Sequence, residues 1–345
     1  MVSLIVAAMA FQQAATRQAP PAETVLWKSV EPSVVVLLRN GETVGVAALI
    51  HDSGLFLAHT SAVGRPGVQT PGKQVRGRLA SGTETNFLVV TSDEQTQLTL
   101  LRALYWEPGT RRVLKVSGQP ATPNVELLAV TTAGPKSGEF VADGKAGLMR
   151  PSLRYVPLSE VRMEGTDEHL GGAFVFDSKG DIVGVLGAAL ATDETRKSVS
   201  DQATGLGGGG LPGAARNALN TFGPGNQTVA YALGREVLQR VVAGFVSPSH
   251  EVQHPTIGIF FKSNPGGRGV LVESVMSGSP SAIAGIHAGD VITQVDGQAV
   301  NSPIELAALL FRKNVGESVK VQYSRGERTS VTDVRVVSGH DELGR

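Results

Sequence analysis

The chain has 345 residues, of which 41% are hydrophobic, 18% charged and 5% aromatic, with 42 glycines. This composition favours a soluble, mostly β protein of two or three domains. Thirty-one basic residues balance thirty-one acidic ones, so no general field would attract nucleic acid. Cysteine is absent, which excludes disulfides, thiolate catalysis and cysteine zinc sites.

Residues 1–23 are predicted to form a leader. Residues 2–11 are apolar, and Ala8-Met9-Ala10 fits the cleavage pattern of a secretory signal, although the first basic residue is Arg17. We therefore predict export to the periplasm or another extracytoplasmic compartment, with a plain apolar leader as the alternative. No apolar run approaches the ~20 residues of a transmembrane helix.

The segment 24–245 is predicted to be one β-rich domain. Short apolar runs alternate with Gly, Pro, Asn and Asp turns, which indicates a barrel or a sandwich. The runs are SVVVLL, VGVAALI, GLFLA, NFLVV, LTLLRAL, VELLAV, FVF and IVGVL. Within the domain, residues 188–227 contain a Gly-rich stretch that lacks the end of a phosphate loop, so we interpret it as a surface insertion. A strand and an amphipathic helix in TVAYALGREVLQRVVAGF close the domain.

The stretch EHLGGAFVFDSKGDIVGV, residues 168–185, predicts a strand, a tight turn over residues 177–180 and a second strand. Gly171 and Gly172 precede the first strand. Since glycine lets a backbone come close to another group, this pair predicts a close approach.

Residues 246–255 form a predicted linker that contains HEVQH, residues 250–254. On a helix, His-Glu-x-x-His places two imidazoles around zinc. Pro255 disfavours helical geometry at His254, and the linker is too short for a supporting helix. We therefore predict no metal site, with zinc hydrolysis as the alternative.

Residues 256–340 are predicted to be a small α+β domain, with two short helices and an Asp296-Gly297 hairpin turn. The block SPSAIAGIHAGD and the VDG turn resemble a PDZ domain of the bacterial HtrA type. The resemblance implies that Ile257, Gly258 and Ile259 hold the terminal carboxylate of a peptide, which then adds a strand to the sheet. The alternative is a domain that only packs on its neighbour.

Upstream, residues 24–245 resemble the trypsin-like double β-barrel of HtrA/DegP-like serine proteases, through PSVVVLL, GLFLAHTSAVG, VVTSDEQTQLTLLRA and HLGGAFVFDSKGDIVGV. The positions that match the family's catalytic histidine, aspartate and serine hold Ser61, Gln97 and Leu170. Acyl transfer needs a nucleophile and a base in hydrogen-bond reach, and leucine supplies neither. Glu168, where the family has glycine, would repel a developing oxyanion.

These residues predict a pseudoprotease that is not an enzyme, needs no cofactor and binds protein C-termini or exposed strands through its PDZ domain. It would act in the cell envelope as a scaffold, a chaperone-like protein or a regulatory partner of active relatives in protein quality control. The resemblance also implies a trimer. The alternative is an active serine endopeptidase with a displaced triad, for which His59 and Asp93 are the nearest substitutes and Thr166 the closest upstream hydroxyl.

Overall fold

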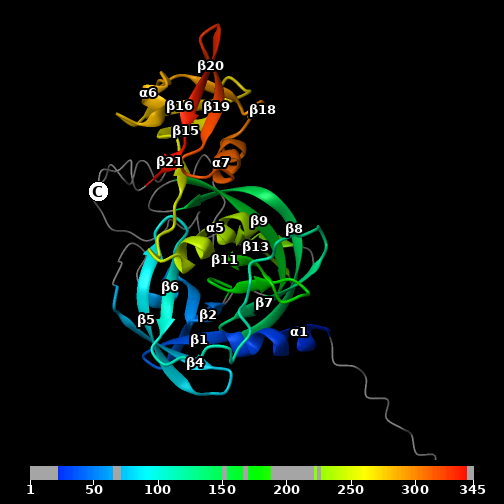
Figure 1. Cartoon of the computed structure of the whole chain (residues 1–345). Helices are drawn as coiled ribbons and strands as arrows, with labels where there is room; N and C mark the ends of the chain where they lie inside the picture. The colour runs from blue at the N-terminus through cyan, green and yellow to red at the C-terminus, as the bar shows by residue number, and fades with distance from the viewer. Residues whose placement is uncertain are drawn as a thin grey trace, which may run out of the picture.

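The computed structural model describes residues 22–64, 71–149, 154–165, 170–187, 221–223 and 227–339. The predicted leader up to residue 21, nearly all of the Gly-rich insertion, Thr166 and Glu168 lie outside the described residues. The described part consists of two β-barrels in sequence, followed by a separate sheet domain (Figure 1). This arrangement confirms the predicted fold class.

The first barrel follows helix α1 (Ala22–Val30) and a 3₁₀ turn, η1 (Glu31–Ser33). Six antiparallel strands close on themselves in the order β1-β2-β3-β6-β5-β4, because β1 pairs with both β2 and β4. Alternate residues of these strands fill the barrel with Leu37, Leu49 and Phe56 among others. The strands are β1 (Val34–Arg39), β2 (Glu42–His51), β3 (Leu55–His59), β4 (Gln74–Leu79), β5 (Glu84–Asp93) and β6 (Leu98–Ala103).

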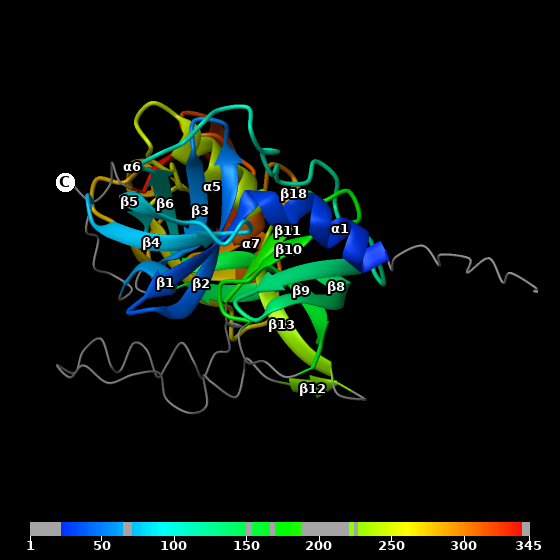
Figure 2. The ribbon, with the colours of Figure 1, turned by 90° about the horizontal axis from the view of Figure 1, so that it is seen from below.

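The second barrel is a seven-stranded sheet in the order β11-β10-β7-β8-β9-β13-β12. An additional pairing of β11 with β13 closes six of these strands into a ring, which lies beside the first barrel in the view from below (Figure 2). The predicted strand, turn and strand after the glycine pair are present as β10 and β11. The strands are β7 (Glu126–Thr131), β8 (Gly134–Met149), β9 (Arg154–Glu164), β10 (Phe174–Phe176), β11 (Ile182–Leu186), β12 (Thr221–Gly223) and β13 (Gln227–Gly234).

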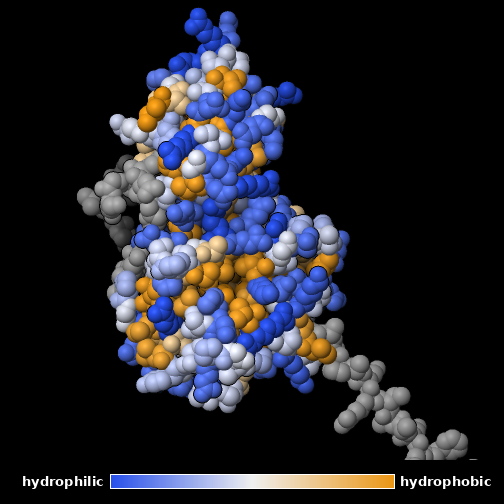
Figure 3. Space-filling view, in the orientation of Figure 1, coloured by the Kyte–Doolittle hydropathy of each residue, from blue (hydrophilic) through white to orange (hydrophobic). Residues whose placement is uncertain are grey.

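The third unit has a sheet in the order β15-β16-β17-β19-β20, with β18 on β17 and two short helices. Asp296 and Gly297 have φ of 50° and 77° and turn the chain between β17 and β18, as predicted. The charged β19–β20 turn lies at the hydrophilic far end of this unit (Figure 3). The elements are β14 (Pro255–Thr256), β15 (Ile259–Ser263), β16 (Val270–Val275), α6 (Pro280–Ile283), β17 (Val291–Val295), β18 (Gln298–Ala299), α7 (Pro303–Phe311), β19 (Ser318–Arg325), β20 (Arg328–Arg335) and β21 (Val337–Ser338).

Helices α5 (Arg235–Val246) and α7 join the barrels to this third unit. Helix α5 buries Val237, Leu238 and Val241 in the apolar cluster between the barrels, and Phe311 at the end of α7 belongs to the same cluster. Arg240 of α5 donates hydrogen bonds to the carbonyl oxygens of Phe311 (2.5 Å) and Lys313 (2.9 Å). A cation at the last carbonyls of a helix is favourable, so α5 fixes the C-terminal end of α7.

Candidate functional site

Gly172, the second glycine of the pair, lies against an imidazole ring, whereas a Cβ built on Gly171 would meet nothing within 4 Å. A Cβ atom built on Gly172, whose φ is +78°, would lie 2.9 Å from the Cβ of His59. A Cβ built on Gly187, whose φ is +128°, would lie 3.2 Å from His59 Nε2. Of the predicted pair, only Gly172 makes the close approach, and its neighbour is His59. His59 ends β3 in the first barrel, whereas Gly172 and Gly187 belong to the second.

His59 also contacts a hydroxyl. Its Nδ1 lies 2.7 Å from Ser61 Oγ and accepts the Ser61 amide at the start of helix α2 (Thr60–Val63). Because an amide can only donate, Nδ1 is the accepting nitrogen, and the Ser61 hydroxyl can donate to it as well. Burial lowers the pKa of His59 to about 4, so the ring is neutral at neutral pH and is a weaker base than an ordinary imidazole.

Leu170, which the sequence predicts to match the family's serine, points into the second barrel. Its side chain is 5% exposed and packs in a cluster with Met163, Val175 and Val183. The Leu170 carbonyl accepts the Ala173 amide (3.0 Å), which forms the turn of the glycine pair. The side chain therefore stabilises the barrel and does not face His59.

Gln97, which the sequence predicts to match the family's aspartate, makes hydrogen bonds within its own turn. Its Nε2 donates to the Glu94 carbonyl (2.7 Å), and its φ is +57°. The Gln97 carbonyl accepts the Thr60 amide (2.8 Å) and so anchors the start of α2. This backbone contact joins the turn to His59 and Ser61.

The displaced-triad hypothesis paired His59 with Asp93, but the structure pairs Asp93 with another histidine. Asp93 Oδ1 lies 2.8 Å from His254 Nε2, and Asp93 Oδ2 accepts the Thr96 hydroxyl (2.5 Å). Burial alone would raise the pKa of Asp93, but the hydrogen bonds from His254, Thr96 and the Gln95 amide outweigh it and hold the pKa below its ordinary value of 3.8.

The two histidines of HEVQH do not converge, and the segment is not helical. His250 accepts from Arg102 (3.1 Å) and donates from Nδ1 to the Phe245 carbonyl (2.6 Å), whereas His254 contacts Asp93. No group of three His, Cys, Asp or Glu side chains arranged for a metal occurs in the part of the chain that the structure describes. The motif therefore lacks the geometry of a zinc helix.

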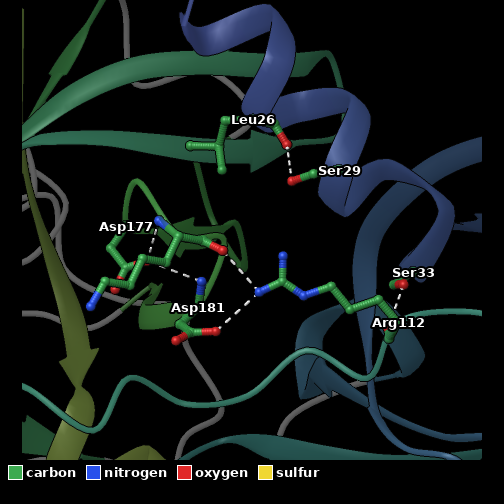
Figure 4. Close-up of polar contacts among 7 residues, drawn as sticks. Leu26, Ser29, Ser33, Arg112, Asp177 and Asp181 are labelled. Atoms are coloured by element: carbon green, nitrogen blue, oxygen red, sulfur yellow. Dashed lines mark hydrogen bonds and ion pairs between the residues drawn. The ribbon is translucent and has the colours of Figure 1, made fainter.

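The β10–β11 turn below the glycine pair is fixed by Arg112 from the connection between the barrels. Its Nη2 donates to the Lys179 carbonyl (2.9 Å) and to Asp181 Oδ1 (3.2 Å) (Figure 4). Ser33, just before β1, donates to the Arg112 carbonyl (2.5 Å). Gly180 has φ of +76°, a backbone conformation that favours glycine in this turn.

Ile257, Gly258 and Ile259 form the loop between β14 and β15. The side chains of Ile257 and Ile259 are 0% and 9% exposed and pack in the third unit's core, so only the backbone of this loop can meet a ligand. Gly258 has φ of +80°, a conformation that favours glycine. The Ser281 amide donates to the Ile257 carbonyl (3.1 Å), and the Met276 amide donates to the Gly258 carbonyl (3.0 Å).

The sequence alone identified neither the His59–Ser61 contact nor the Asp93–His254 contact. A His-x-Ser spacing was the available signal for the first, and it recurs at His51 and Ser53, where Nδ1 and Oγ lie 2.9 Å apart. No short-range pattern indicates the Asp93–His254 contact, because the two residues are 161 positions apart.

Comparisons with known proteins agree with this architecture. The family model for the PDZ domain matches residues 255–336. The serine protease Do-like HtrA of Lactococcus lactis is 26% identical over 279 residues, which cover 77% of this chain and 64% of that relative. The magnetosome formation protease MamE of Paramagnetospirillum magneticum is 34% identical over 125 residues, 34% of this chain and 16% of that protein.

Solved structures share the fold. The HtrA-type protease AlgW with decapeptide superimposes with a TM-score of 0.61 at 14% identity, covering 92% of this chain and 98% of that one. The serine endoprotease from Yersinia pestis gives 0.57 at 16% identity, covering 93% and 99%. The chain therefore shares the fold of these proteases, a trypsin-like double barrel followed by a PDZ domain.

These comparisons contradict the prediction that the chain is not an enzyme. That prediction relied on the residues at three positions, Ser61, Gln97 and Leu170. The similar proteins are named proteases or endoproteases, and this similarity points to an enzyme. Separately, no helix in the described ranges is long and apolar enough to cross a membrane.

Proposed function

We propose that this protein captures the free C-terminus or an exposed strand of a partner protein in its PDZ domain and acts in protein quality control outside the cytoplasm. The structurally similar protease AlgW was solved with a decapeptide, which supports a peptide ligand. The name of the relative DegQ of Escherichia coli, a periplasmic endoprotease 37% identical over 67 residues, supports the compartment. Binding alone gives a scaffold or chaperone-like role, and cleavage would add removal of the captured protein.

The observation that carries this proposal is the open edge of β15. In the described sheet, β15 pairs only with β16, so its outer edge is available to an added strand. The carbonyls of Ile257 and Gly258 both accept backbone hydrogen bonds from within the domain. The Gly258 amide donates to the Thr256 hydroxyl (3.1 Å), and a carboxylate is the stronger acceptor for such a donor.

Fluorescence anisotropy with a labelled hexapeptide tests this function. A peptide with an apolar C-terminal residue and a free carboxylate should bind. The same peptide with a C-terminal amide should bind with an affinity lower by about tenfold or more, because the charged acceptor is lost. Equal binding of the acid and the amide would refute carboxylate recognition. Absence of binding for both would refute the PDZ function.

Peptide-bond hydrolysis at His59 and Ser61 is the second candidate function. The His59–Ser61 contact favours it, together with the names of the relatives. Attack by Ser61 Oγ on the carbonyl carbon of a peptide bond would pass the hydroxyl proton to His59 Nδ1, which would return it to the leaving amine as the C–N bond breaks; water would then hydrolyse the acyl-serine by the same route. The lowered pKa leaves Nδ1 unprotonated at neutral pH, and it also makes this nitrogen a weaker base than an ordinary imidazole. Ser61 is exposed, so a substrate can reach it.

The chain supplies a matched control for this second function. His51 and Ser53 make the same Nδ1 to Oγ contact, and both are exposed in the turn after β2. Gly172 and Gly187 border the His59 ring, whereas no described glycine has a side-chain atom of His51 among its nearest contacts. If Ser61 reacts and Ser53 does not, the surroundings of His59 at Gly172 and Gly187, and not the local His–Ser contact, create the nucleophile.

Labelling with a serine-directed phosphonate, followed by peptide mapping, tests this assignment. The proposal expects label on Ser61, loss of label and of casein cleavage in Ser61→Ala, and no change in Ser53→Ala. Label that persists in Ser61→Ala would place the nucleophile elsewhere. A protein that neither takes up label nor cleaves casein would refute hydrolysis while leaving the peptide-binding function intact.

A further inference from the structure

The Asp93–His254 pair is buried at the junction of the first barrel and the PDZ domain. The two side chains are 5% and 4% exposed, and Asp93 Oδ1 lies 2.8 Å from His254 Nε2. Water is largely excluded from this contact, so the direct hydrogen bond replaces solvation of Asp93 Oδ1 and His254 Nε2. The other ring nitrogen, His254 Nδ1, is buried and has no hydrogen-bond partner among the described residues. Phe311 of α7 lies edge-on to the His254 ring, with centroids 6.2 Å apart.

On the PDZ side, the His254 backbone is part of the domain's first pairing. Its carbonyl accepts the Gly339 amide (2.9 Å), which continues the pairing of β14 with β21. Pro255 follows directly and restricts the chain. The peptide-binding loop begins three residues after His254, so a fixed His254 holds the base of that loop.

On the barrel side, Asp93 ends β5 and holds the following turn. Its Oδ2 accepts the Thr96 hydroxyl and its Oδ1 accepts the Gln95 amide. The next residue, Gln97, accepts the Thr60 amide through its carbonyl. A short run of hydrogen bonds therefore connects His254 to the first residue of α2, which lies between His59 and Ser61.

We infer that the Asp93–His254 pair is an interdomain pin: it holds the PDZ domain on the first barrel and positions the turn that anchors α2. The first part is independent of the proposed function, and the second rests on the assignment of His59 and Ser61 as the hydrolytic site. Both residues act through others and are positioning residues. His254, the second histidine of HEVQH, therefore has a structural role that involves no metal.

A second contact between the linker and the first barrel serves as the matched control. Arg102 on β6 donates to His250 Nε2 (3.1 Å), and both of these side chains lie at the surface. Exposed polar contacts contribute little, because water replaces them readily. If any linker contact sufficed, loss of Arg102 and loss of Asp93 would have the same effect.

Distance measurements between spin labels test the pin directly. The chain contains no cysteine, so Ser81→Cys in the first barrel and Glu327→Cys in the PDZ domain, both exposed, give two unique labels. The unaltered pair should show one narrow distance distribution. Asp93→Ala should broaden it and add longer distances, whereas Asp93→Asn, which still accepts from His254, and Arg102→Gln should keep it narrow.

A distribution in Asp93→Ala as narrow as in the unaltered protein would overturn the pin. If Asp93→Ala does not fold, His254→Phe replaces it, since phenylalanine keeps the ring packing on Phe311 and removes the donor; a narrow distribution there overturns the proposal equally.

The imidazole resonances of His59 report on the positioning of α2. They should move in His254→Phe and stay in place in Arg102→Gln. Unmoved His59 resonances in His254→Phe would refute the positioning part of the inference. Because neither measurement uses peptide cleavage, failure of the pin and failure of the hydrolytic function give different results.

Discussion

The proposed peptide-binding loop of the PDZ domain and the His59–Ser61 site are built from different parts of the chain. The loop offers backbone amides and a strand edge, and its side chains Ile257 and Ile259 are turned into the core. The His59–Ser61 site depends on side chains, and the positions predicted to match the family's triad hold Ser61, Gln97 and Leu170. A backbone-built site tolerates changes of most residues as long as the conformation is kept. A site built from side chains changes its chemistry with each substitution.

Among the variants that test this difference between the two sites, the one that removes the Leu170 side chain should have the largest effect. Leu170→Ala should lower the free energy of unfolding by about 2–5 kcal/mol, because a buried leucine leaves a cavity. Denaturant unfolding measures the change. Val331→Ala, at a position that is 56% exposed, should stay within about 0.5 kcal/mol. A loss of stability no larger than that of Val331→Ala would show that Leu170 faces solvent and not the barrel core.

The next effect concerns pH. The folded protein resists protonation of His59 until about pH 4, whereas the unfolded chain takes up this proton near the ordinary value of 6.5. Stability should therefore fall as the pH is lowered from about 6.5 to about 4, since the unfolded state binds more protons there. One unit of pKa shift corresponds to about 1.4 kcal/mol, so a loss of about 1–3 kcal/mol is expected.

Thermal unfolding across this pH range in the native protein and in His59→Asn measures the contribution of His59. Asparagine keeps a helix-capping side chain at the start of α2 and removes the titration. Asp93 does not contribute to the change over this pH range. Its pKa is lowered in the folded state, so the stability that this provides is lost only below the ordinary pKa of 3.8, as the pH falls through the lower folded-state pKa. Parallel pH profiles for both proteins would refute the burial of a neutral His59.

The outcome of the sequence predictions follows the same division between backbone and side chains. Local patterns predicted the strands, the turn over residues 177–180 and the Asp296-Gly297 hairpin, because turn geometry depends on a few adjacent residues. They did not predict that Leu170 faces inward or that Asp93 binds His254. Such contacts depend on how two barrels and a linker pack, and no spacing within one segment encodes that packing.

Gly258 tests the backbone-built site itself. Gly258→Ala places a side chain at φ of +80°, and such strain costs about 1–3 kcal/mol. If the loop relaxes away from its binding conformation, affinity for the free-acid peptide should fall about tenfold, which equals about 1.4 kcal/mol. Gly267→Ala, at φ of +102° in the β15–β16 turn with open space around it, carries similar strain away from the loop. Equal losses of affinity in both variants would refute a local role for Gly258.

The smallest expected effect is at Arg112, which tests whether the hairpin after the glycine pair needs support from a side chain. The Arg112 and Asp181 side chains are 41% and 26% exposed, and an ion pair of this kind contributes about 0.2–1 kcal/mol. Arg112→Gln should therefore lower the free energy of unfolding by less than about 1 kcal/mol, but by more than Arg76→Gln, whose bridge to Glu84 is longer (3.6 Å) and whose side chain is 64% exposed. The difference arises because Arg112 also donates to the Lys179 carbonyl. Equal effects of the two variants in urea unfolding would mean that the backbone of the turn holds the hairpin without Arg112.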